Sequence, residues 1–189
     1  RIQGLRIFCE YRDQRSFPLL LPLLDQPCPV ERMSAVYALG RNPCPSAVQK
    51  LVSLLETDDN AYVRRATAWS LANYDNQIVL KPLINALKND VAAVRLWSSS
   101  SLAEIGNVSL ENAQLAAEQL LISLKIDNES GVRSNCIWSL CRLFEKLNNT
   151  FQESFVDECT KIALFDKEPS VMEEAKTALD SMGMQGFYN

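Results

Sequence analysis

VRRATAWSLANY, residues 63–74, returns in altered form as AVRLWSSSSLAE at residues 93–104 and as GVRSNCIWSLCR at residues 131–142. A segment that recurs at a regular interval is typical of repeat proteins, whose units are too small to bury an apolar face alone and therefore stack on their neighbours. The repetition predicts a stack of similar units. What such a stack binds depends on the side chains that each copy leaves on its surface.

The copies align on one arginine, here called the anchor, and columns are numbered from it. Successive anchors are 31, 32, 31 and 38 residues apart, and a further 39 residues lead to Met172, where the arginine is lost. The anchors are Arg1, Arg32, Arg64, Arg95 and Arg133. Column +7 holds Phe8, Leu39, Leu71, Leu102, Leu140 and Leu179. Column −1 is valine in four copies, and columns +3 and +6 are mostly small. On a helix with 3.6 residues per turn these columns share one side, which we predict to pack inward.

A second amphipathic segment precedes each of these helices. These segments span residues 16–24, 46–56, 77–88, 111–125 and 151–165. A short polar turn separates the two helices of a unit, and it contains Asp25, Asp58, Asp90, Asp127 or Asp166. The pattern predicts an all-α fold, a right-handed α-solenoid of about five helical pairs plus a partial pair at the N-terminal side. We expect one continuous solenoid over residues 1–182 and a loose tail over residues 183–189.

The two longer intervals contain extra residues near positions 106–113 and 146–153. Their sequences, GNVSLENA and KLNNTFQE, have the character of turns and helix starts. We expect loops there, with Ser109 and Thr150 as helix N-caps.

Composition narrows the class of protein. Of the 189 residues, 47% are hydrophobic and 22% charged, which excludes a disordered chain. The net charge of −4 and the absence of basic runs disfavour nucleic-acid binding. No segment has the roughly 18 to 20 uncharged apolar residues of a membrane span. The six cysteines form no CxxC pair, so we expect reduced thiols and a cytoplasmic protein.

Residues that carry common chemistry are missing. The chain has no histidine, which removes the commonest general base and the Ser-His and Cys-His nucleophile pairs. It also has no P-loop, GxGxxG or GxSxG motif. We therefore predict no catalytic residues, no metal site and no cofactor, and we favour a protein that is not an enzyme. An iron–sulfur cluster shared between these cysteines and another protein stays open.

The repeated helices are also apolar on the side that faces away from the inward stripe. Columns +1, +4 and +5 contain several large side chains. We predict that these residues bind a partner: Met33, Tyr37, Arg65, Trp69, Leu96, Ile137 and Trp138. Large aromatic side chains are enriched at interfaces, and solenoids bind along their concave face. The alternative is that adjacent repeats cover these columns, which would make them part of the core.

The chain resembles HEAT-type repeats, in particular the short HEAT-like form of phycobilisome lyases. The resemblance rests on LLPLLDQPCPVERMSAVYALG (residues 20–40), LVSLLETDDNAYVRRATAWSLAN (51–73) and PLINALKNDVAAVRLWSSSSLAEIG (82–106). It implies a ladder of charge-assisted hydrogen bonds between turn aspartates and anchor arginines of neighbouring units. The implied members are Asp25, Asp58, Asp90 and Asp127, with Arg32, Arg64, Arg95 and Arg133. The alternative is a row of anion-binding arginines.

Among cyanobacterial members, RMSAVYALGRNP (residues 32–43) and VRLWSSSSLAE (94–104) resemble a HEAT protein of iron homeostasis, which acts with an Nfu-type iron–sulfur carrier, more than they resemble a bilin lyase chain. This resemblance implies a scaffold that grips a partner protein in its groove, the partner being such a carrier. The alternative is a subunit of a bilin lyase, which would handle an open-chain tetrapyrrole and act on a phycobiliprotein. Neither reading involves nucleic acid or a membrane.

Overall fold

A computed structural model describes residues 4, 7–8, 10–75, 77–184 and 186. The chain forms two compact units, Arg1–Ser101 and Leu102–Asn189, and the boundary lies inside one helix. All regular structure in the described residues is helical, which confirms the predicted all-α fold of helical pairs. The predicted single solenoid over residues 1–182 stays a prediction.

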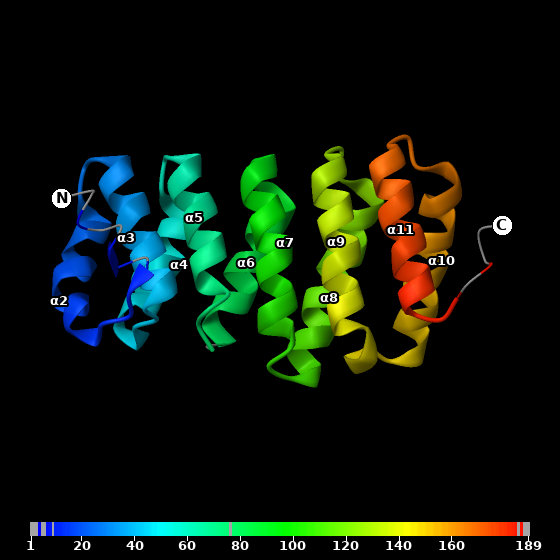
Figure 1. Cartoon of the computed structure of the whole chain (residues 1–189), viewed down its shortest axis with the longest axis horizontal. Helices are drawn as coiled ribbons and strands as arrows, with labels where there is room; N and C mark the ends of the chain where they lie inside the picture. The colour runs from blue at the N-terminus through cyan, green and yellow to red at the C-terminus, as the bar shows by residue number, and fades with distance from the viewer. Residues whose placement is uncertain (1–3, 5–6, 9, 76, 185, 187–189) are drawn as a thin grey trace. The chain divides into compact units, whose positions relative to one another are not determined.

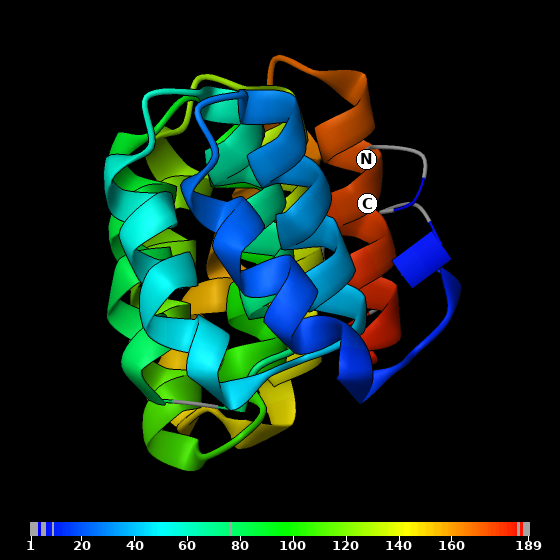
Figure 2. The same cartoon turned by 90° about the vertical axis from the view of Figure 1, so that its left-hand side faces the viewer.

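Unit 1 contains two complete helical pairs and most of a third (Figure 1). Its α-helices are α2 (Phe17–Leu20), α3 (Pro29–Arg41), α4 (Val48–Thr57), α5 (Ala61–Leu71), α6 (Leu80–Asn89) and the start of α7 (Ala92–Gly106). Short 3-10 helices at Gln14–Ser16, Leu21–Asp25, Pro45–Ala47 and Gln77–Val79 lengthen the first helices of the pairs. Figure 2 shows α2 beside α3, and Figure 1 shows α3 beside α5.

Unit 2 contains the end of α7 and two further pairs. They are α8 (Leu110–Ile126) with α9 (Ser130–Leu143), and α10 (Asn149–Phe165) with α11 (Pro169–Ser181). A 3-10 helix, Phe144–Lys146, follows α9. Within this unit α9 packs against both α8 and α11. All five predicted first-helix segments are therefore found where the sequence indicated them.

The longer intervals lengthen helices, contrary to the expected loops. The first helices α8 and α10 have 17 residues each, whereas α4 and α6 have 10. Ser109 caps α8 as expected, because its side chain accepts a hydrogen bond from the Asn112 N–H. Thr150 is inside α10, however, and the cap is Asn148, which accepts from the Phe151 N–H at 2.9 Å. An asparagine two residues earlier supplies the same kind of acceptor.

The core lies along the predicted inward stripe. The valines of column −1 and the leucines of column +7 are almost completely buried: Val63, Val94, Val132, Val171, Leu39, Leu71, Leu102, Leu140 and Leu179. Small residues of columns +3 and +6 lie between them, and they allow close approach of the helices. The prediction of the packing face is confirmed.

Tyr74 ties the ends of two second helices together in unit 1. Its hydroxyl donates to the Leu39 carbonyl at 3.0 Å and accepts from the Cys44 N–H at 3.4 Å. Burial raises the pKa of Tyr74 to about 12. The contact holds the last turn of α3 next to the end of α5, where the candidate surface described below begins.

The end of α11 is closed by its own backbone. Gly183 has a φ of +76°, and the Met184 N–H donates to the Leu179 carbonyl at 2.9 Å while the Gly183 N–H donates to the Asp180 carbonyl at 3.1 Å. This pair of bonds is a Schellman motif, which favours glycine because other residues rarely adopt a positive φ. Most of the predicted loose tail, residues 185 and 187–189, lies outside the described residues.

Candidate functional site

The second helices of unit 1 bring columns +1 and +5 to the surface and bury column +4. Met33, Tyr37, Arg65, Trp69 and Leu96 are all half-buried, so each has side-chain area that a partner could reach. In the four copies anchored at Arg32, Arg64, Arg95 and Arg133, the column +4 residues are completely buried: Val36, Ala68, Ser99 and Ile137. Second helices of successive repeats pack side by side, as α3 does with α5 and α9 with α11. A neighbouring helix therefore covers the flank that includes column +4.

Ile137 consequently needs a correction. It was predicted to bind a partner, but none of its side chain is exposed. Its place is in the core of unit 2, where truncation would lower stability directly. The helical wheel placed it on the outer side because a wheel treats each helix as isolated.

A continuous cluster of aromatic and arginine side chains lies across α3 and α5. The ring centroids of Tyr37 and Trp69 are 5.3 Å apart and their planes are tilted by 55°. The Arg41 guanidinium lies 5.2 Å from the Trp69 ring, and Arg65 Nη2 lies 3.3 Å from the Tyr37 hydroxyl. Arg65 also lies 5.5 Å from the ring of Tyr62. We call Met33, Tyr37, Arg41, Arg65 and Trp69 the second-helix face of unit 1.

Gly40 allows Trp69 to approach the backbone of α3 closely. A Cβ on Gly40 would be 2.6 Å from Cζ3 of Trp69 and 3.2 Å from the Cα of Ser70. The indole can therefore approach the α3 backbone this closely only because column +8 has no side chain there. One edge of the Trp69 ring thus contacts Gly40, and part of the side chain stays exposed to solvent.

The equivalent face of unit 2 is built differently. Trp138 in α9 is 41% exposed, and the Arg142 guanidinium lies 5.0 Å from its ring. Arg142 Nη2 is 2.8 Å from a carboxylate oxygen of Glu104 on α7. Here the arginine above the tryptophan already has an acidic partner within the unit.

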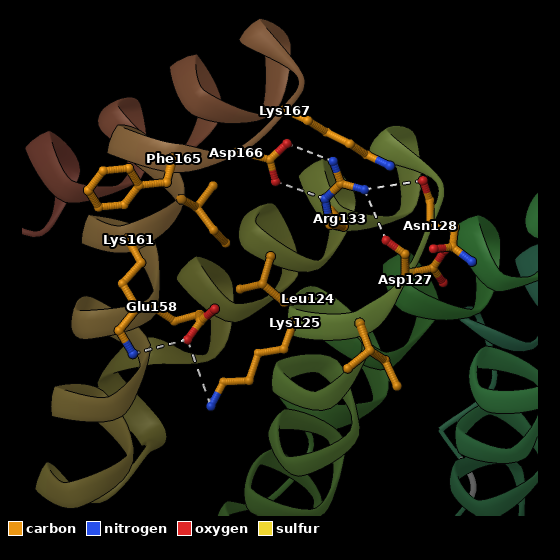
Figure 3. A pocket seen from close by; sticks show the side chains of 12 residues that line it. Leu124, Lys125, Asp127, Asn128, Arg133, Glu158, Lys161, Phe165, Asp166 and Lys167 are labelled. Carbon is orange, nitrogen blue, oxygen red and sulfur yellow. Dashed lines mark hydrogen bonds and ion pairs between the residues drawn. The ribbon is translucent and has the colours of Figure 1, made fainter.

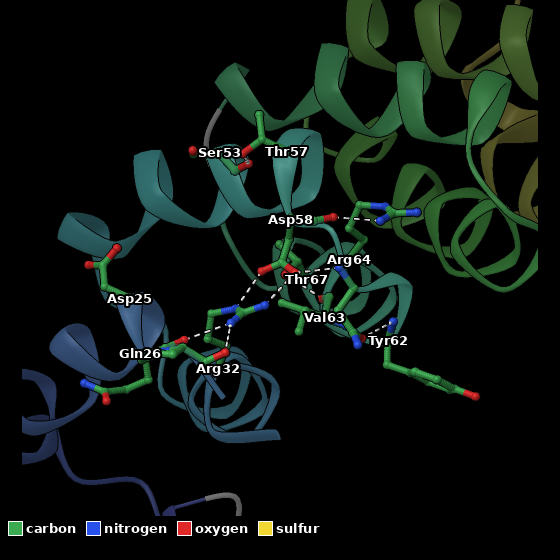
Figure 4. Close-up of polar contacts among 12 residues, drawn as sticks. Asp25, Gln26, Arg32, Ser53, Thr57, Asp58, Tyr62, Val63, Arg64 and Thr67 are labelled. Carbon is green, nitrogen blue, oxygen red and sulfur yellow. Dashed lines mark hydrogen bonds and ion pairs between the residues drawn. The ribbon is translucent and has the colours of Figure 1, made fainter. Parts of the chain in front are cut away.

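The anchor arginines form rungs between neighbouring repeats. Arg32 donates through Nε and Nη2 to the Asp58 carboxylate at 2.7 and 2.9 Å, and Arg64 donates likewise to Asp90 at 2.8 and 2.7 Å. Each also donates to a carbonyl of its own turn: Arg32 to Gln26 at 2.8 Å and Arg64 to Asp58 at 2.7 Å (Figure 4). A rung thus fixes the turns of two successive repeats at once.

Unit 2 repeats this geometry in a more buried place. Arg133 donates to both carboxylate oxygens of Asp166, at 3.0 and 2.7 Å, and to the Asp127 carbonyl at 2.9 Å (Figure 3). Only 6% of the Arg133 side chain and 9% of the Asp166 side chain are exposed. Asp166 was not among the predicted ladder residues, although its place in the last turn could have indicated it.

The other predicted ladder residues have these contacts. The Asp25 carboxylate forms an ion pair with Lys50, a first-helix residue, and not with Arg32. Arg95 donates to the Asp90 carbonyl at 2.8 Å, and the Asp127 carboxylate accepts from the Glu129 N–H at 3.0 Å. Since each rung runs from an arginine to the following turn, the partner of Arg32 is Asp58.

The rungs keep their carboxylates charged. Burial alone would raise the pKa of Asp58, but hydrogen bonds from Arg32 and from the Asn60 N–H lower it below its usual value. For Asp166 burial also acts upwards, and the bonds from Arg133 and the Glu168 N–H again bring its pKa below the usual value. Anchor arginines that are paired in this way have their donors occupied, which argues against a row of anion sites.

Two grooves open between successive first helices beside these rungs. One in unit 2, of about 430 Å³, is lined by Leu124, Lys125, Lys161, Phe165 and Asp166 among others (Figure 3). The other, of about 330 Å³ in unit 1, contains Leu55, Glu56, Asn85, Asn89 and Asp90. Lys125 and Lys161 in the first groove approach Glu158 at 3.9 and 3.7 Å. In both grooves most of the lining residues come from the ends of two successive first helices and from the turns that follow them. Grooves of this kind therefore result from the stacking of the repeats.

The cysteines differ in exposure. Cys44, Cys136 and Cys159 are buried, Cys141 is half-buried and Cys28 is exposed, and all five are free thiols; Cys9 lies outside the described residues. Burial raises the pKa of Cys141 to about 11, and it raises that of Cys159 further. Among the residues that the structure describes, no three Cys, Asp or Glu side chains are grouped so as to hold a metal ion. None of the described helices has the length and apolarity needed to cross a bilayer.

Comparison with known proteins gives a family and several similar folds. A family model described as HEAT repeats matches residues 1–72 and 48–141. No curated protein matches the sequence. A chain from the complex of CpcE and CpcF of phycocyanin lyase from Nostoc sp. PCC7120 is 23% identical, with a TM-score of 0.67 over 88% of this chain and 99% of that one.

Two designed or engineered proteins have similar folds. A designed armadillo repeat protein in complex with the peptide (KR)4 is 20% identical, with a TM-score of 0.67 over 100% of this chain and 91% of that one. A further engineered protein is 21% identical, with a TM-score of 0.65 over 96% of this chain and 91% of that one. At these identities the likeness shows the helical-repeat fold alone.

Proposed function

This chain belongs to the HEAT-repeat family, and on that premise we propose that it is a non-enzymatic scaffold that binds another protein on its second helices. The observation that carries the proposal is the aromatic cluster. The tilted rings of Tyr37 and Trp69 pack against each other with part of each side chain accessible, and Trp138 is 41% exposed at the same column of another repeat. Partly exposed aromatic residues on rigid helices are typical interface hot spots.

We further propose that the partner is a protein of iron–sulfur delivery, an Nfu-type carrier. The support is the resemblance of residues 32–43 and 94–104 to a HEAT protein of iron homeostasis. The scaffold itself would hold no cluster in this proposal. Its role would be to bring the carrier to a third protein.

A bilin lyase subunit is the second candidate. The fold is similar to that of a chain in a phycocyanin lyase complex, and an aromatic face suits a tetrapyrrole as well as a peptide. In this case the partner would be a phycobiliprotein. Adding an open-chain bilin separates the two candidates, because binding to a lyase subunit would shift the absorbance of the bilin to the red.

The test of the scaffold is quantitative binding after capture. The protein is used as bait in a lysate of the cells that make it, and the captured partner is purified and titrated. Trp69→Ala and Trp138→Ala should each weaken binding by about 2 kcal/mol or more. Phe165→Ala is the matched control, because Phe165 is a large side chain, 80% exposed, that lies on a first helix.

Two measurements make the result decisive. Circular dichroism and the melting temperature of each variant show that it is folded, which matters for Trp69 because it also packs on Gly40. Titration of the protein with a cluster-loaded Nfu-type carrier tests directly whether such a carrier is the partner. Equal affinity of wild type, Trp69→Ala and Trp138→Ala for the captured partner would exclude the second helices as the binding surface.

A further inference from the structure

The second-helix face of unit 1 has two arginines without an acidic partner. Within the part of the chain that the structure describes, no carboxylate lies within 4.0 Å of Arg41 or Arg65. Arg65 has the Tyr37 hydroxyl as its one hydrogen-bond acceptor there, and its buried Nε has none. The arginines of the three described rungs, in contrast, each hold a carboxylate through two donors.

Both unpaired guanidinium groups are held over aromatic rings. Arg41 lies 5.2 Å from the ring of Trp69, and Arg65 lies 5.5 Å from the ring of Tyr62. A cation–π contact does not consume the N–H donors of a guanidinium, so the terminal nitrogens of both arginines keep donors for an acceptor, whereas the buried Nε of Arg65 is out of a partner's reach. The rings therefore restrict the two side chains without satisfying them. Such preorganised donors lose less entropy when they bind a carboxylate.

Unit 2 shows what completes this arrangement. Arg142 stands in the same column as Arg41, nine residues after its anchor, and it lies over Trp138 of its own helix, whereas Arg41 lies over Trp69 of the next repeat. There the Glu104 carboxylate binds the arginine at 2.8 Å. In unit 1 the residues of that column in the flanking repeats are Glu10, which forms no ion pair with Arg41 among the described contacts, and the neutral Asn73.

We propose that the second-helix face of unit 1 binds an acidic segment of the partner protein. One carboxylate binds Arg41, in the way that Glu104 binds Arg142, and another binds Arg65. An apolar side chain between them packs on Trp69. This inference rests on the proposed scaffold function and adds the chemical class of the partner.

The helix geometry limits the spacing of the acidic groups. Arg65 stands in column +1 of α5 and Arg41 in column +9 of α3, and eight helix positions correspond to a rise of about 12 Å along the helix axes. The spacing of two packed helices adds about 8–10 Å across the axes, so the two positions are about 15 Å apart. An extended chain covers that distance in about four residues. The segment should thus carry carboxylates about four positions apart. Because the whole chain has a net charge of −4, general attraction for acidic peptides does not account for such binding.

The experiment uses a short peptide that alternates aspartate and glutamate, and its basic counterpart that alternates lysine and arginine. Each carries a neutral fluorophore, and binding to the full chain is followed by anisotropy. The acidic peptide should bind, the basic one should not, and affinity should fall as salt rises from about 50 to about 500 mM. Arg41→Gln and Arg65→Gln should each weaken binding about tenfold, the loss expected of one charge-assisted contact.

Arg142→Gln is the matched control, because its arginine already has Glu104, and it should bind the acidic peptide as the wild type does. Arg41→Lys and Arg65→Lys keep the charge and should restore part of the affinity. Circular dichroism confirms that every variant is folded. The proposal is overturned if the acidic peptide does not bind, if the double Arg41→Gln, Arg65→Gln variant binds it unchanged, or if Arg142→Gln loses as much.

The captured partner separates this inference from the function on which it rests. If Trp69→Ala weakens partner binding while Arg41→Gln and Arg65→Gln do not, the scaffold stands and the acidic segment is excluded. If neither the tryptophan nor the arginine variants affect partner binding, both proposals fail. If both sets weaken it, both are supported.

Discussion

At the scale of single residues, the arginine ion pairs differ in how much they contribute to stability. Arg133 and Asp166 are almost buried, whereas Arg15 and Asp13 form an ion pair of similar length, 2.6 Å, on the open surface. Water screens the exposed pair, so it contributes little. In the buried pair, removal of one partner leaves the other charge largely out of water and without its counter-ion.

We therefore expect Arg133→Ala to lower the free energy of unfolding by about 3–5 kcal/mol at neutral pH. Chemical denaturation followed by circular dichroism measures this loss. Arg15→Ala is the control, and its midpoint should match that of the wild type. A small effect of Arg133→Ala would mean that the rung is not a structural element.

The same substitution should change the response to acid. Burial raises the pKa of Asp166 and the bonds from Arg133 lower it more, so its net pKa in the folded state is below that in the unfolded chain. A group of this kind stabilises the fold above its unfolded pKa of about 4, and this stabilisation is lost as the pH falls through the folded value. The difference between wild type and Arg133→Ala should therefore shrink below about pH 4. A difference that is independent of pH would show that the charge of Asp166 plays no part.

At the scale of helices, the distance between α3 and α5 is set at Gly40. Alanine is the better helix former by about 1 kcal/mol, so propensity alone would favour Gly40→Ala. The added Cβ, however, would meet Trp69 Cζ3 at 2.6 Å and the Ser70 backbone at 3.2 Å. The backbone of α5 cannot move aside without disturbing the buried contacts on its other side.

We expect Gly40→Ala to destabilise the protein by about 1–3 kcal/mol and to disturb the emission of Trp69. Gly106→Ala is the matched comparison. Its Cβ would meet the two terminal methyl groups of Leu143, at 2.9 and 3.1 Å, and these can rotate away. Thermal melts of the two variants should rank Gly40→Ala as the less stable. The opposite order would show that α3 and α5 have room to separate.

Sequence patterns predicted the helices better than the contacts that their side chains make with neighbouring repeats. The spacing of Leu39, Leu71 and Leu102 is a local property, and it identified the helices and their inner side correctly. The burial of Ile137 depends on the neighbouring repeat, which a single-helix projection does not contain. The stacking of Arg41 on Trp69 likewise joins residues 28 positions apart in sequence, and no local periodicity encodes it.

At the scale of the whole molecule, the contacts of each repeat are mostly with its sequence neighbours. In repeat proteins this makes stability a sum of local terms, so that parts of the chain open separately. The division at Ser101 and Leu102 gives a natural place to look for such behaviour.

We expect Phe155→Ala, which empties a completely buried position of unit 2, to speed hydrogen exchange mainly in residues 102–189. Leu51→Ala, at an equally buried position of unit 1, should have its main effect in residues 1–101. Mass spectrometry of the exchanged peptides distinguishes the two patterns. Uniform loss of protection in both variants would show that the chain unfolds as one cooperative block.

The direction of the rungs has a consequence for how such a chain can grow. Each rung joins an arginine of one repeat to the turn carboxylate of the next, as in Arg32 with Asp58 and Arg64 with Asp90. A repeat thus carries two complementary groups. The turn between its two helices has an aspartate that accepts from the preceding repeat, and its second helix has an arginine that donates to the following one. Duplication of a gene segment encoding one unit would insert a copy whose two ends already fit its neighbours. Selection could then lengthen the array first and alter the exposed columns of the new copy afterwards.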